Sequence, residues 1–304
     1  MKALVISGGG SKGAFAGGVA QYLINERKRN YDLFLGTSTG SLLVSHLALG
    51  KIEDLKRVYT NVNQQSIFSN CPFRVTRRGG NTIVNINHRN VLWNLLNGRK
   101  TFGESKSLRQ LISRELPRED FNKLKSSKTD VVVTLSNIST NEVEYKSIKD
   151  YGYEDFCDWI WGSCNYVPFM SLMKKNGFHY ADGGFGSLVP IREAVKRGAK
   201  EIDVIVLDTE IRLMNRILGT NPFSILLNTH EFMMDQVEKH NITIGKLFAN
   251  QHDVQLNFYY TPTILTTNSL IFDKKLMTKW WDYGFKHAKN IHPEDMGEFK
   301  VDLE

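Results

Sequence analysis

Short apolar runs alternate with amphipathic segments along the first 50 residues. Residues 2–7 form an apolar run with β-branched members that ends in glycines, and residues 31–35 form a second run of this kind. Short apolar runs bounded by turn residues are typical of buried parallel strands. Residues 14–29, with apolar positions at helical spacing, and residues 41–49 are predicted helices. This βαβα order implies right-handed crossovers and a parallel sheet with helices on its faces.

The same alternation returns after residue 130. Residues 131–137 and 142–147 predict a hairpin. Further helices and strands are predicted from periodicity and length, the helices over residues 153–164, 191–197, 223–248 and 274–290 and the strands over residues 178–181, 202–208 and 254–260. No internal repeat, low-complexity tract or linker interrupts the chain. The pattern therefore predicts an α/β fold, a three-layer α/β/α sandwich around a mostly parallel central sheet.

Residues 64–128 are less regular and are predicted to form an insertion that caps the sheet. The pattern indicates a strand over residues 82–86 and short helices over residues 91–96 and 108–116. Within residues 71–128 there are 13 Lys and Arg against 4 Asp and Glu, a net charge of +9 in a chain whose net charge is +7. One stretch thus carries the whole positive excess, which favours an anionic partner such as a lipid surface. We do not expect nucleic-acid binding, because no recognised module is present and the aromatic residues do not alternate with basic ones.

Composition describes an ordinary globular protein. Of 304 residues, 41% are hydrophobic and 23% are charged, which allows a core and excludes dominant disorder. The three cysteines, Cys71, Cys157 and Cys164, show no CxxC spacing, so we expect neither a zinc site nor a disulfide framework. No secretory signal and no window of 18 apolar residues is visible. We therefore expect a cytoplasmic protein, soluble or peripherally attached to a membrane.

The sharpest candidate for chemistry is the sequence GTSTG, Gly36 to Gly40, between a predicted strand and a predicted helix. A GxSxG sequence in this context places its serine on a strained turn at the carboxyl end of the sheet. The hydroxyl of Ser38 would then lie near a helix N-terminus, which favours developing negative charge. The alternative is a Gly/Ser turn that only starts a helix.

A glycine-rich loop follows the first strand, with Gly8, Gly9, Gly10, Lys12 and Gly13 in the sequence GGGSKG. Its amides predict an anion site, which is either a phosphate cradle or an oxyanion hole. A dinucleotide site would need an acidic residue at the end of the second strand, where the GTSTG sequence stands instead. A Walker A loop would need Ser or Thr after the lysine. The oxyanion hole is favoured, because the candidate nucleophile ends the neighbouring strand.

A serine nucleophile needs a base, and Asp182 is the best candidate. It ends a predicted strand and is followed by Gly183 and Gly184, although an ordinary Asp-Gly turn has the same sequence. Histidine is the usual base, but none of the eight histidines lies in a recognisable motif. An α/β-hydrolase would also place its serine after several strands, so position 38 argues against that fold.

The sequences SGGGSKG, GTSTG and DGG, in this order, resemble the patatin-like phospholipase family. The tetrapeptide Trp161 to Cys164, followed by Pro168 and Phe169, is similar to the family's small-residue helix and proline turn, and residues 182–207 are similar to its Asp loop, helix and strand. The resemblance covers residues 2–210. We therefore expect a catalytic core over residues 1–210, which includes the insertion 64–128, and a C-terminal helical extension over residues 211–304 packed on it.

This resemblance implies a Ser–Asp dyad without histidine, with Ser38 as nucleophile and Asp182 as proton acceptor. The amides of the loop Gly8, Gly9 and Gly10 would form the oxyanion hole, and Lys12 would either add positive charge or lie in solvent. Gly13 belongs to the same loop, and the flanking glycines of the other two motifs are Gly36, Gly40, Gly183 and Gly184. An Asp has a reference pKa near ~3.9, so we expect burial to raise the pKa of Asp182.

The activity that the resemblance implies is hydrolysis of lipid esters, first among them glycerophospholipids, through an acyl-Ser38 intermediate. It requires neither a metal nor a cofactor. The alternatives within the class are a lysophospholipase, a lipase or a thioesterase. Outside it stand a nucleotide-binding protein and a lipid-binding or signalling protein that does not turn substrate over. The basic stretch 71–128 would rest on an anionic membrane surface.

Overall fold

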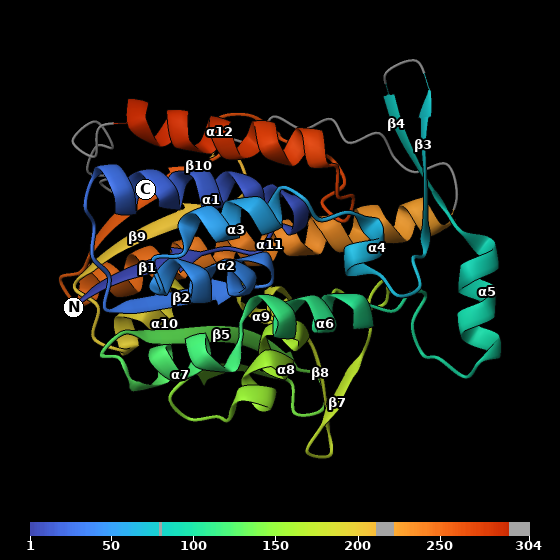
Figure 1. Ribbon diagram of the computed structural model, residues 1–304, viewed down its shortest axis with the longest axis horizontal. Coiled ribbons are helices and arrows are strands. Elements are labelled where there is room, and N and C mark those ends of the chain that lie inside the picture. Colours follow the sequence, from blue (N-terminus) through green and yellow to red (C-terminus); the bar gives the residue numbers. More distant parts are fainter. Residues whose placement is uncertain (79–80, 211–221, 292–304) are drawn as a thin grey trace, which may run out of the picture.

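The computed structural model describes residues 1–78, 81–210 and 222–291, and its centre is an eight-stranded mixed sheet (Figure 1). The strands follow the order β10-β9-β1-β2-β5-β8-β7, and β6 pairs with β5 outside this path. The sheet contains β1 (Lys2–Ile6), β2 (Leu33–Thr37), β5 (Asp130–Asn137), β6 (Glu142–Ser147), β7 (Met173–Lys175), β8 (Phe178–Asp182), β9 (Glu201–Val206) and β10 (Gln255–Tyr260). The neighbouring pairs from β10 through β9, β1 and β2 to β5 are all parallel. Strands β6 and β8 pair antiparallel with β5, and β7 pairs antiparallel with β8. The predicted α/β class with a mostly parallel sheet is confirmed.

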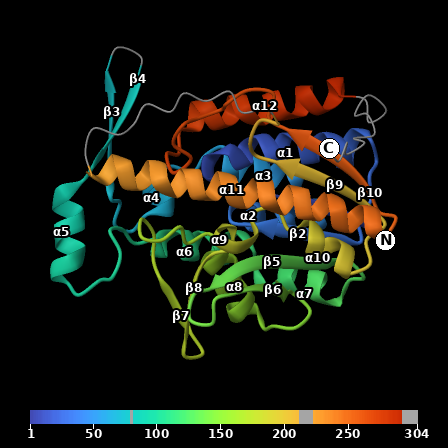
Figure 2. The ribbon, with the colours of Figure 1, turned by 180° about the vertical axis from the view of Figure 1, so that it is seen from behind.

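Helices cover both faces of the sheet, because side chains alternate between two cores along each strand. In β1, Leu4 and Ile6 enter the larger core, and Ala3 and Val5 enter the smaller one. The larger core lies under η1 (Gly10–Lys12), α1 (Gly13–Gln21), η2 (Tyr22–Glu26), α2 (Thr39–Ala48), α3 (Ile52–Tyr59), α8 (Tyr153–Ser163) and α12 (Lys274–Asn290). The smaller core lies under α9 (Gly184–Ser187), α10 (Ile191–Lys196) and α11 (Pro222–Gln251), which Figure 2 shows on the opposite face.

The residues after 210 join both the sheet and the helical layers. Strand β10 pairs in parallel with β9 at one edge of the sheet. Helix α12 crosses α1 so closely that a Cβ atom on Gly18 would lie 1.9 Å from the carbonyl oxygen of Trp281. The glycines of α1 therefore make room for the backbone of α12, and the predicted strand 254–260 and helix 274–290 take their places in the fold.

The insertion consists of two parts. Helices α6 (Lys106–Glu115) and α7 (Arg118–Ser126) pack on the larger core through Leu108 and Phe121. The other elements, α4 (Gln64–Ile67), β3 (Phe73–Arg78), β4 (Asn81–Ile86) and α5 (His88–Leu96), lie beyond the carboxyl ends of the parallel strands, where β3, β4 and α5 project from the body (Figure 1). The predicted strand 82–86 and the helices 91–96 and 108–116 are present as β4, α5 and α6. None of the described helices is long and apolar enough to cross a bilayer.

Candidate active site

The chain reverses sharply at Ser38, between β2 and α2. Ser38 has φ 53° and ψ −120°, a conformation that side-chain-bearing residues rarely adopt. The turn needs glycine on both sides, because a Cβ atom on Gly36 would lie 2.3 Å from the carbonyl carbon of Gly40, and one on Gly40 would lie 2.3 Å from the carbonyl oxygen of Ile6. The spacing of GTSTG is thus the spacing that brings α2 directly onto β1 and β2.

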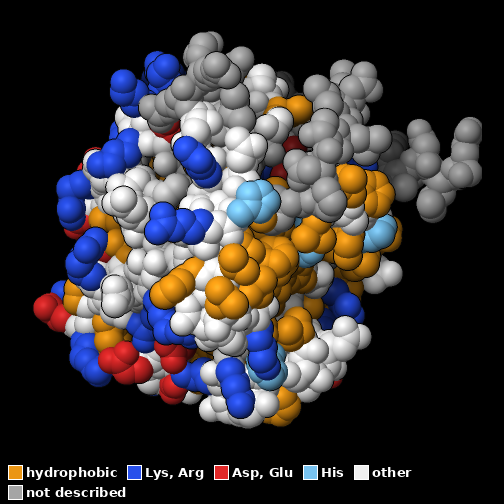
Figure 3. Space-filling view, turned by 90° about the vertical axis from the view of Figure 1, so that its right-hand side faces the viewer, with side chains coloured by type: hydrophobic (Ala, Val, Ile, Leu, Met, Phe, Trp, Pro, Cys, Tyr) orange, Lys and Arg blue, Asp and Glu red, His pale blue; other side chains and the backbone are white. Residues whose placement is uncertain are grey.

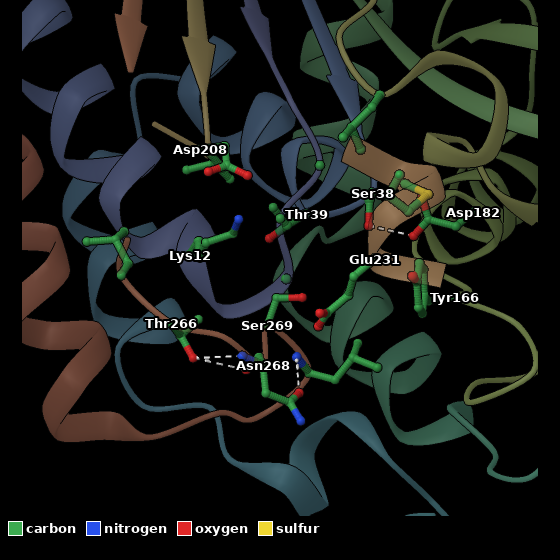
Figure 4. Close-up of a pocket in the computed structure, with 18 of the residues that line it drawn as sticks. Lys12, Ser38, Thr39, Tyr166, Asp182, Asp208, Glu231, Thr266, Asn268 and Ser269 are labelled. Carbon is green, nitrogen blue, oxygen red and sulfur yellow. Dashed lines mark hydrogen bonds between the residues drawn. The ribbon is translucent and has the colours of Figure 1, made fainter. Parts of the chain in front are cut away.

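The hydroxyl of Ser38 donates a hydrogen bond of 2.6 Å to Oδ2 of Asp182 (Figure 4). Asp182 ends β8 and is 2% exposed, and its other oxygen, Oδ1, accepts a hydrogen bond of 2.8 Å from the amide of Gly184. Gly183 has to be glycine here, since a Cβ atom would lie 2.2 Å from the carbonyl oxygen of Thr134. The DGG sequence therefore fixes a buried carboxylate against the serine.

Burial changes the acid–base properties of this carboxylate. Loss of hydration raises the pKa of Asp182 to about 7, although the hydrogen bonds from Ser38 and Gly184 act in the opposite direction. A carboxylate with a pKa near the operating pH is a far better general base than an ordinary aspartate. The environment of Asp182 thus supplies the basicity that we expected from burial.

The glycine-rich loop lies directly beside the serine. A Cβ atom on Gly8 would lie 3.2 Å from the Cβ atom of Ser38. Among the described residues, the amides of Gly9 and Gly10 have no hydrogen-bond acceptor, whereas the amide of Gly8 donates to the carbonyl of Leu188 at 3.2 Å. Gly10 has φ +54°, which glycine adopts without strain. The loop therefore presents two unpaired donors near the nucleophile candidate.

Two further residues of the loop have different surroundings. The side chain of Lys12 enters the same cavity as Ser38 (Figure 4). Gly13 begins α1 and is covered by Tyr59, whose hydroxyl oxygen would lie 2.3 Å from a Cβ atom there. Gly13 thus packs closely against its neighbours beneath the site.

Ser38, Asp182, Lys12 and the glycines at positions 8–10 line a cavity of about 580 Å³. One wall is apolar and includes Leu42, Ile67, Leu108 and Phe272. Another wall carries carboxylates, from Asp208 after β9 and from Glu231, Asp235 and Glu238 of α11. Loop residues of the segment 261–272 also line the cavity, and the amide of Ser11 donates to the carbonyl of Ser269 at 2.8 Å. Segments beyond residue 210 therefore form part of the cavity wall beside the glycine-rich loop.

Comparison with known proteins identifies the family to which the chain belongs. The family model described as patatin-like phospholipase matches residues 4–195, more than half of the chain. The chain belongs to the patatin-like phospholipase family. The resemblance in the sequence is confirmed, and the matched residues contain all three glycine-bearing motifs. The cavity walls from α11 and from residues 261–272 lie outside the match.

Two individual proteins are similar over much of the chain. YjjU of Escherichia coli (strain K12) is 25% identical over 210 residues, which are 67% of this chain and 51% of YjjU. The crystal structure of VipD from Legionella pneumophila superimposes with a TM-score of 0.51 at 16% identity and covers 95% of this chain and 66% of that chain. The chain thus spans about half of YjjU and about two thirds of the VipD structure, and the likeness to VipD is one of fold.

The lining of the cavity, as far as the structure describes it, gives the serine no histidine. His46, eight positions after Ser38, is buried and its Nε2 atom lies 2.9 Å from the carbonyl of Glu115. Cys164 does line the cavity, but burial raises the pKa of its thiol well above the usual value, and its Sγ donates to the carbonyl of Ser38 at 3.1 Å. The described residues also contain no group of three or more His, Cys, Asp or Glu placed to hold a metal ion.

Sequence reasoning missed a support of the nucleophile candidate. The hydroxyl oxygen of Ser163 accepts a hydrogen bond of 3.0 Å from the amide of Ser38, and it lies 2.8 Å from the hydroxyl oxygen of Ser41. The carbonyl of Asn165 accepts the amide of Asp182 at 2.9 Å. The tetrapeptide Trp161 to Cys164 resembled a family motif, yet only the fold shows that the end of α8 contacts Ser38 and that the residue after the tetrapeptide contacts Asp182.

Proposed function

We propose that the protein is a serine acyl hydrolase that releases fatty acids from lipid esters, with glycerophospholipids as its first substrate class. The single observation that carries this proposal is the 2.6 Å hydrogen bond between Ser38 and the buried carboxylate of Asp182. Membership of the patatin-like phospholipase family supports it, because the matched residues include both. The apolar wall of the cavity supports a lipid substrate.

In the acylation half-reaction, Oγ of Ser38 attacks the ester carbonyl carbon while Asp182 accepts the hydroxyl proton. The oxyanion of the tetrahedral intermediate accepts hydrogen bonds from the amides of Gly9 and Gly10, close to the N-terminus of α2. The intermediate collapses, the bond to the alcohol oxygen breaks, and Asp182 returns its proton to the leaving alcohol. The product on the enzyme is an acyl ester of Ser38.

Deacylation repeats these steps with water. Asp182 accepts a proton from the attacking water, the same amides hold the second oxyanion, and Ser38 regains its proton as the fatty acid leaves. Gly8 serves by its small size, since its own amide is paired with Leu188. Lys12 adds a positive charge to the cavity in which the oxyanions form. This cycle needs no group beyond the chain and water.

We place the acyl chain of the substrate along the apolar wall. Leu42, Ile67, Leu108 and Phe272 line the main cavity and also border a smaller apolar pocket of about 60 Å³. This pocket lies among α2, α3 and α6, and Leu111 and Ile112 belong to its lining. A hydrocarbon chain that follows this wall leaves water without leaving the active site, which favours long acyl groups.

Lipid esters are held in membranes, so the protein has to reach a lipid surface. The basic stretch 71–128 supports peripheral association with an anionic surface, because Arg74, Arg89, Arg99 and Lys100 are exposed. The side chains of Arg77 and Arg78 lie outside the described residues. Binding that weakens as salt is raised would support this part of the proposal, and binding independent of salt would contradict it.

The hydrolase proposal is tested by fatty-acid release from mixed phospholipid vesicles without added calcium. Wild type is compared with Ser38→Ala and Asp182→Asn, and with the matched exposed variants Ser126→Ala and Asp150→Asn. We expect the first two variants to lose at least about a thousandfold in rate and the controls to keep it. In parallel, a fluorophosphonate probe should label wild type at Ser38. A folded wild type that the probe does not label at Ser38 would point to lipid binding without turnover.

A further inference from the structure

Helix α5 is held to the protein through its polar side. Asn90 donates through its side chain to the carbonyl of Cys71 at 3.0 Å, and Asn94 donates to the carbonyl of Thr101 at 3.1 Å. The side chain of Asn70 bonds to both, reaching the carbonyl of Asn90 at 3.2 Å and Oδ1 of Asn94 at 2.7 Å. Asn94 is accordingly buried. The face of α5 that meets the body is therefore a face of asparagines.

The opposite side of α5 is apolar and faces solvent. Leu92, Trp93 and Leu96 are 58%, 67% and 76% exposed, and Leu95 is 48% exposed. A single exposed leucine is ordinary, but four large apolar side chains within five consecutive positions form a patch. This orientation is the reverse of a surface helix on a globular core, where the apolar side turns inward. The helix thus offers its apolar face to something outside the chain.

The surroundings of this patch are basic. Between Asp54 and Glu104 the sequence contains no Asp or Glu. Arg89 lies on α5 itself, Arg99 and Lys100 lie three and four positions after its end at Leu96, and all three are exposed. Figure 3 shows hydrophobic side chains gathered on this side of the molecule, with Lys and Arg around them. An apolar centre with a cationic border matches the surface of an anionic bilayer, where negatively charged headgroups lie above an apolar acyl layer.

The patch lies on the same side of the molecule as the carboxyl ends of the parallel strands. Strands β3 and β4 and helix α5 project there (Figure 1), and Val84 of β4 lines the active-site cavity. A surface that contacts α5 would therefore face the cavity that holds Ser38.

We propose that α5 is an interfacial anchor that lies in the headgroup region of an anionic bilayer, with Leu92, Trp93 and Leu96 in the apolar boundary and Arg89, Arg99 and Lys100 against lipid phosphates. The choice of a bilayer over a protein partner rests on the proposed lipid-ester substrate. The anchor holds the cavity at the surface from which the substrate is drawn. It is an equilibrium contact, since one short helix buries only a few side chains.

The experiment measures vesicle binding in a Ser38→Ala background, so that the lipids stay intact. Vesicles of phosphatidylcholine with phosphatidylglycerol are compared with pure phosphatidylcholine in a flotation assay. The test variant is Leu92→Ser/Trp93→Ser/Leu96→Ser, and its matched control is Ile244→Ser/Leu247→Ser, which changes two exposed apolar residues of α11. A charge variant, Arg89→Gln/Arg99→Gln/Lys100→Gln, is matched by Lys28→Gln/Lys196→Gln/Lys279→Gln, three exposed lysines outside the basic stretch.

We expect the apolar variant to lose at least about tenfold in binding to mixed vesicles, and the matched control to bind as the parent does. The charge variant should lose about tenfold on mixed vesicles and little on pure phosphatidylcholine, with its control unchanged. Trp93 gives a direct readout, because its emission should shift to the blue when vesicles are added. Trp93→Phe should keep binding and lose that shift.

Three outcomes would overturn the proposal. The first is unchanged binding by a folded apolar variant, and the second is a vesicle-induced spectrum that Trp93→Phe leaves unchanged. The third is self-association without lipid that the apolar variant abolishes, which would make α5 a contact between copies of the chain. Hydrolysis of a monomeric short-chain ester, which needs no membrane contact, separates the test of the anchor from the test of the hydrolase activity. Variants of α5 should leave this hydrolysis intact, and its absence in wild type would refute the hydrolase while the binding data still decide on the anchor.

Discussion

Asp182 lies in hydrogen-bond contact with Ser38, at 2.6 Å, although 144 positions separate the two residues in the chain. The contact exists because β2 and β8 are both neighbours of β5, so that the turn after β2 and the end of β8 come together across one strand. Gly36 and Gly183 permit the close approaches on either side. The pair is thus a product of sheet topology and of glycines at two backbone crossings.

The first prediction concerns the pH dependence of activity. Burial raises the pKa of Asp182 to about 7, and only the ionised carboxylate can accept the Ser38 proton. The value of kcat/KM should therefore fall on the acidic side with an apparent pKa of about 7. A pH–rate profile on a monomeric ester, free of surface effects, measures it. A limb well below pH 5 would show that Asp182 is not the buried base described here.

The second prediction concerns stability. In the folded state the pKa of Asp182 is about 7, whereas in the unfolded chain it is near ~3.9. At a pH between these two pKa values the carboxyl group is protonated in the folded state and ionised in the unfolded state. The free energy of unfolding of wild type should thus decrease as pH rises from about 4 to about 7. Asn cannot ionise, so Asp182→Asn should gain about 2 to 3 kcal/mol over wild type on going from pH 5 to pH 8.

Urea unfolding at both pH values measures this difference. Asp150→Asn is the control, because Asp150 is an exposed aspartate on the surface, and it should show no such gain. If Asp182→Asn changed the free energy of unfolding by the same amount at pH 5 and at pH 8, the carboxylate would have an ordinary pKa in the folded protein.

The sequence was informative where motifs are local and uninformative where the site is assembled from distant segments. The strand-turn-helix context of Ser38 and the strand end at Asp182 were visible, as were most strands and most of the longer helices, whereas the short amphipathic helix α3 was not predicted. Helix α7, with only Phe121 and Leu124 as apolar positions, and strand β3, rich in arginine, gave too weak a periodic signal to be predicted.

The assembly of the cavity walls around Ser38 could not be predicted, although helices that contribute to them, such as α6 and α11, were. Segment 261–272 has no regular structure for most of its length, and its position over the glycine-rich loop depends on tertiary contacts such as that between Ser269 and Ser11. The same holds for Ser163, whose contact with the amide of Ser38 joins the end of α8 to the start of α2. The polar tether of α5 likewise requires Asn70, which is distant in sequence from Asn94.

The third prediction concerns the Asp loop. In Gly183→Ala the new methyl group would meet the carbonyl of Thr134, which is backbone and cannot move freely. We expect a loss of about 1 to 3 kcal/mol in stability, together with a large loss of kcat as Asp182 is displaced. The control is Gly152→Ala, where nothing lies within 4 Å of the new atom. A fully active and stable Gly183→Ala would contradict the packing described for this loop.

The fourth prediction concerns chain length. Leu108 lies on the apolar wall shared by the main cavity and the smaller pocket. Leu108→Trp should shift the preference toward shorter acyl chains by about tenfold in kcat/KM. Each methylene group bound in a hydrophobic pocket contributes only a modest factor to kcat/KM, and the larger tryptophan would displace several methylene groups of a long chain. A series of esters of graded length measures it, with the exposed Leu276→Trp as control. An unchanged length profile would place the acyl chain elsewhere.

The most direct test of the central claim is the chemical identification of the intermediate. Wild type is mixed with a long-chain phospholipid, quenched in acid within the first turnover and digested, and the peptide that contains Ser38 is analysed by mass spectrometry. The dyad predicts one acyl group as an ester on Ser38, absent in Ser38→Ala and greatly reduced in Asp182→Asn. Fatty-acid release that continues in Ser38→Ala, with no acyl group on this peptide in wild type, would contradict the mechanism.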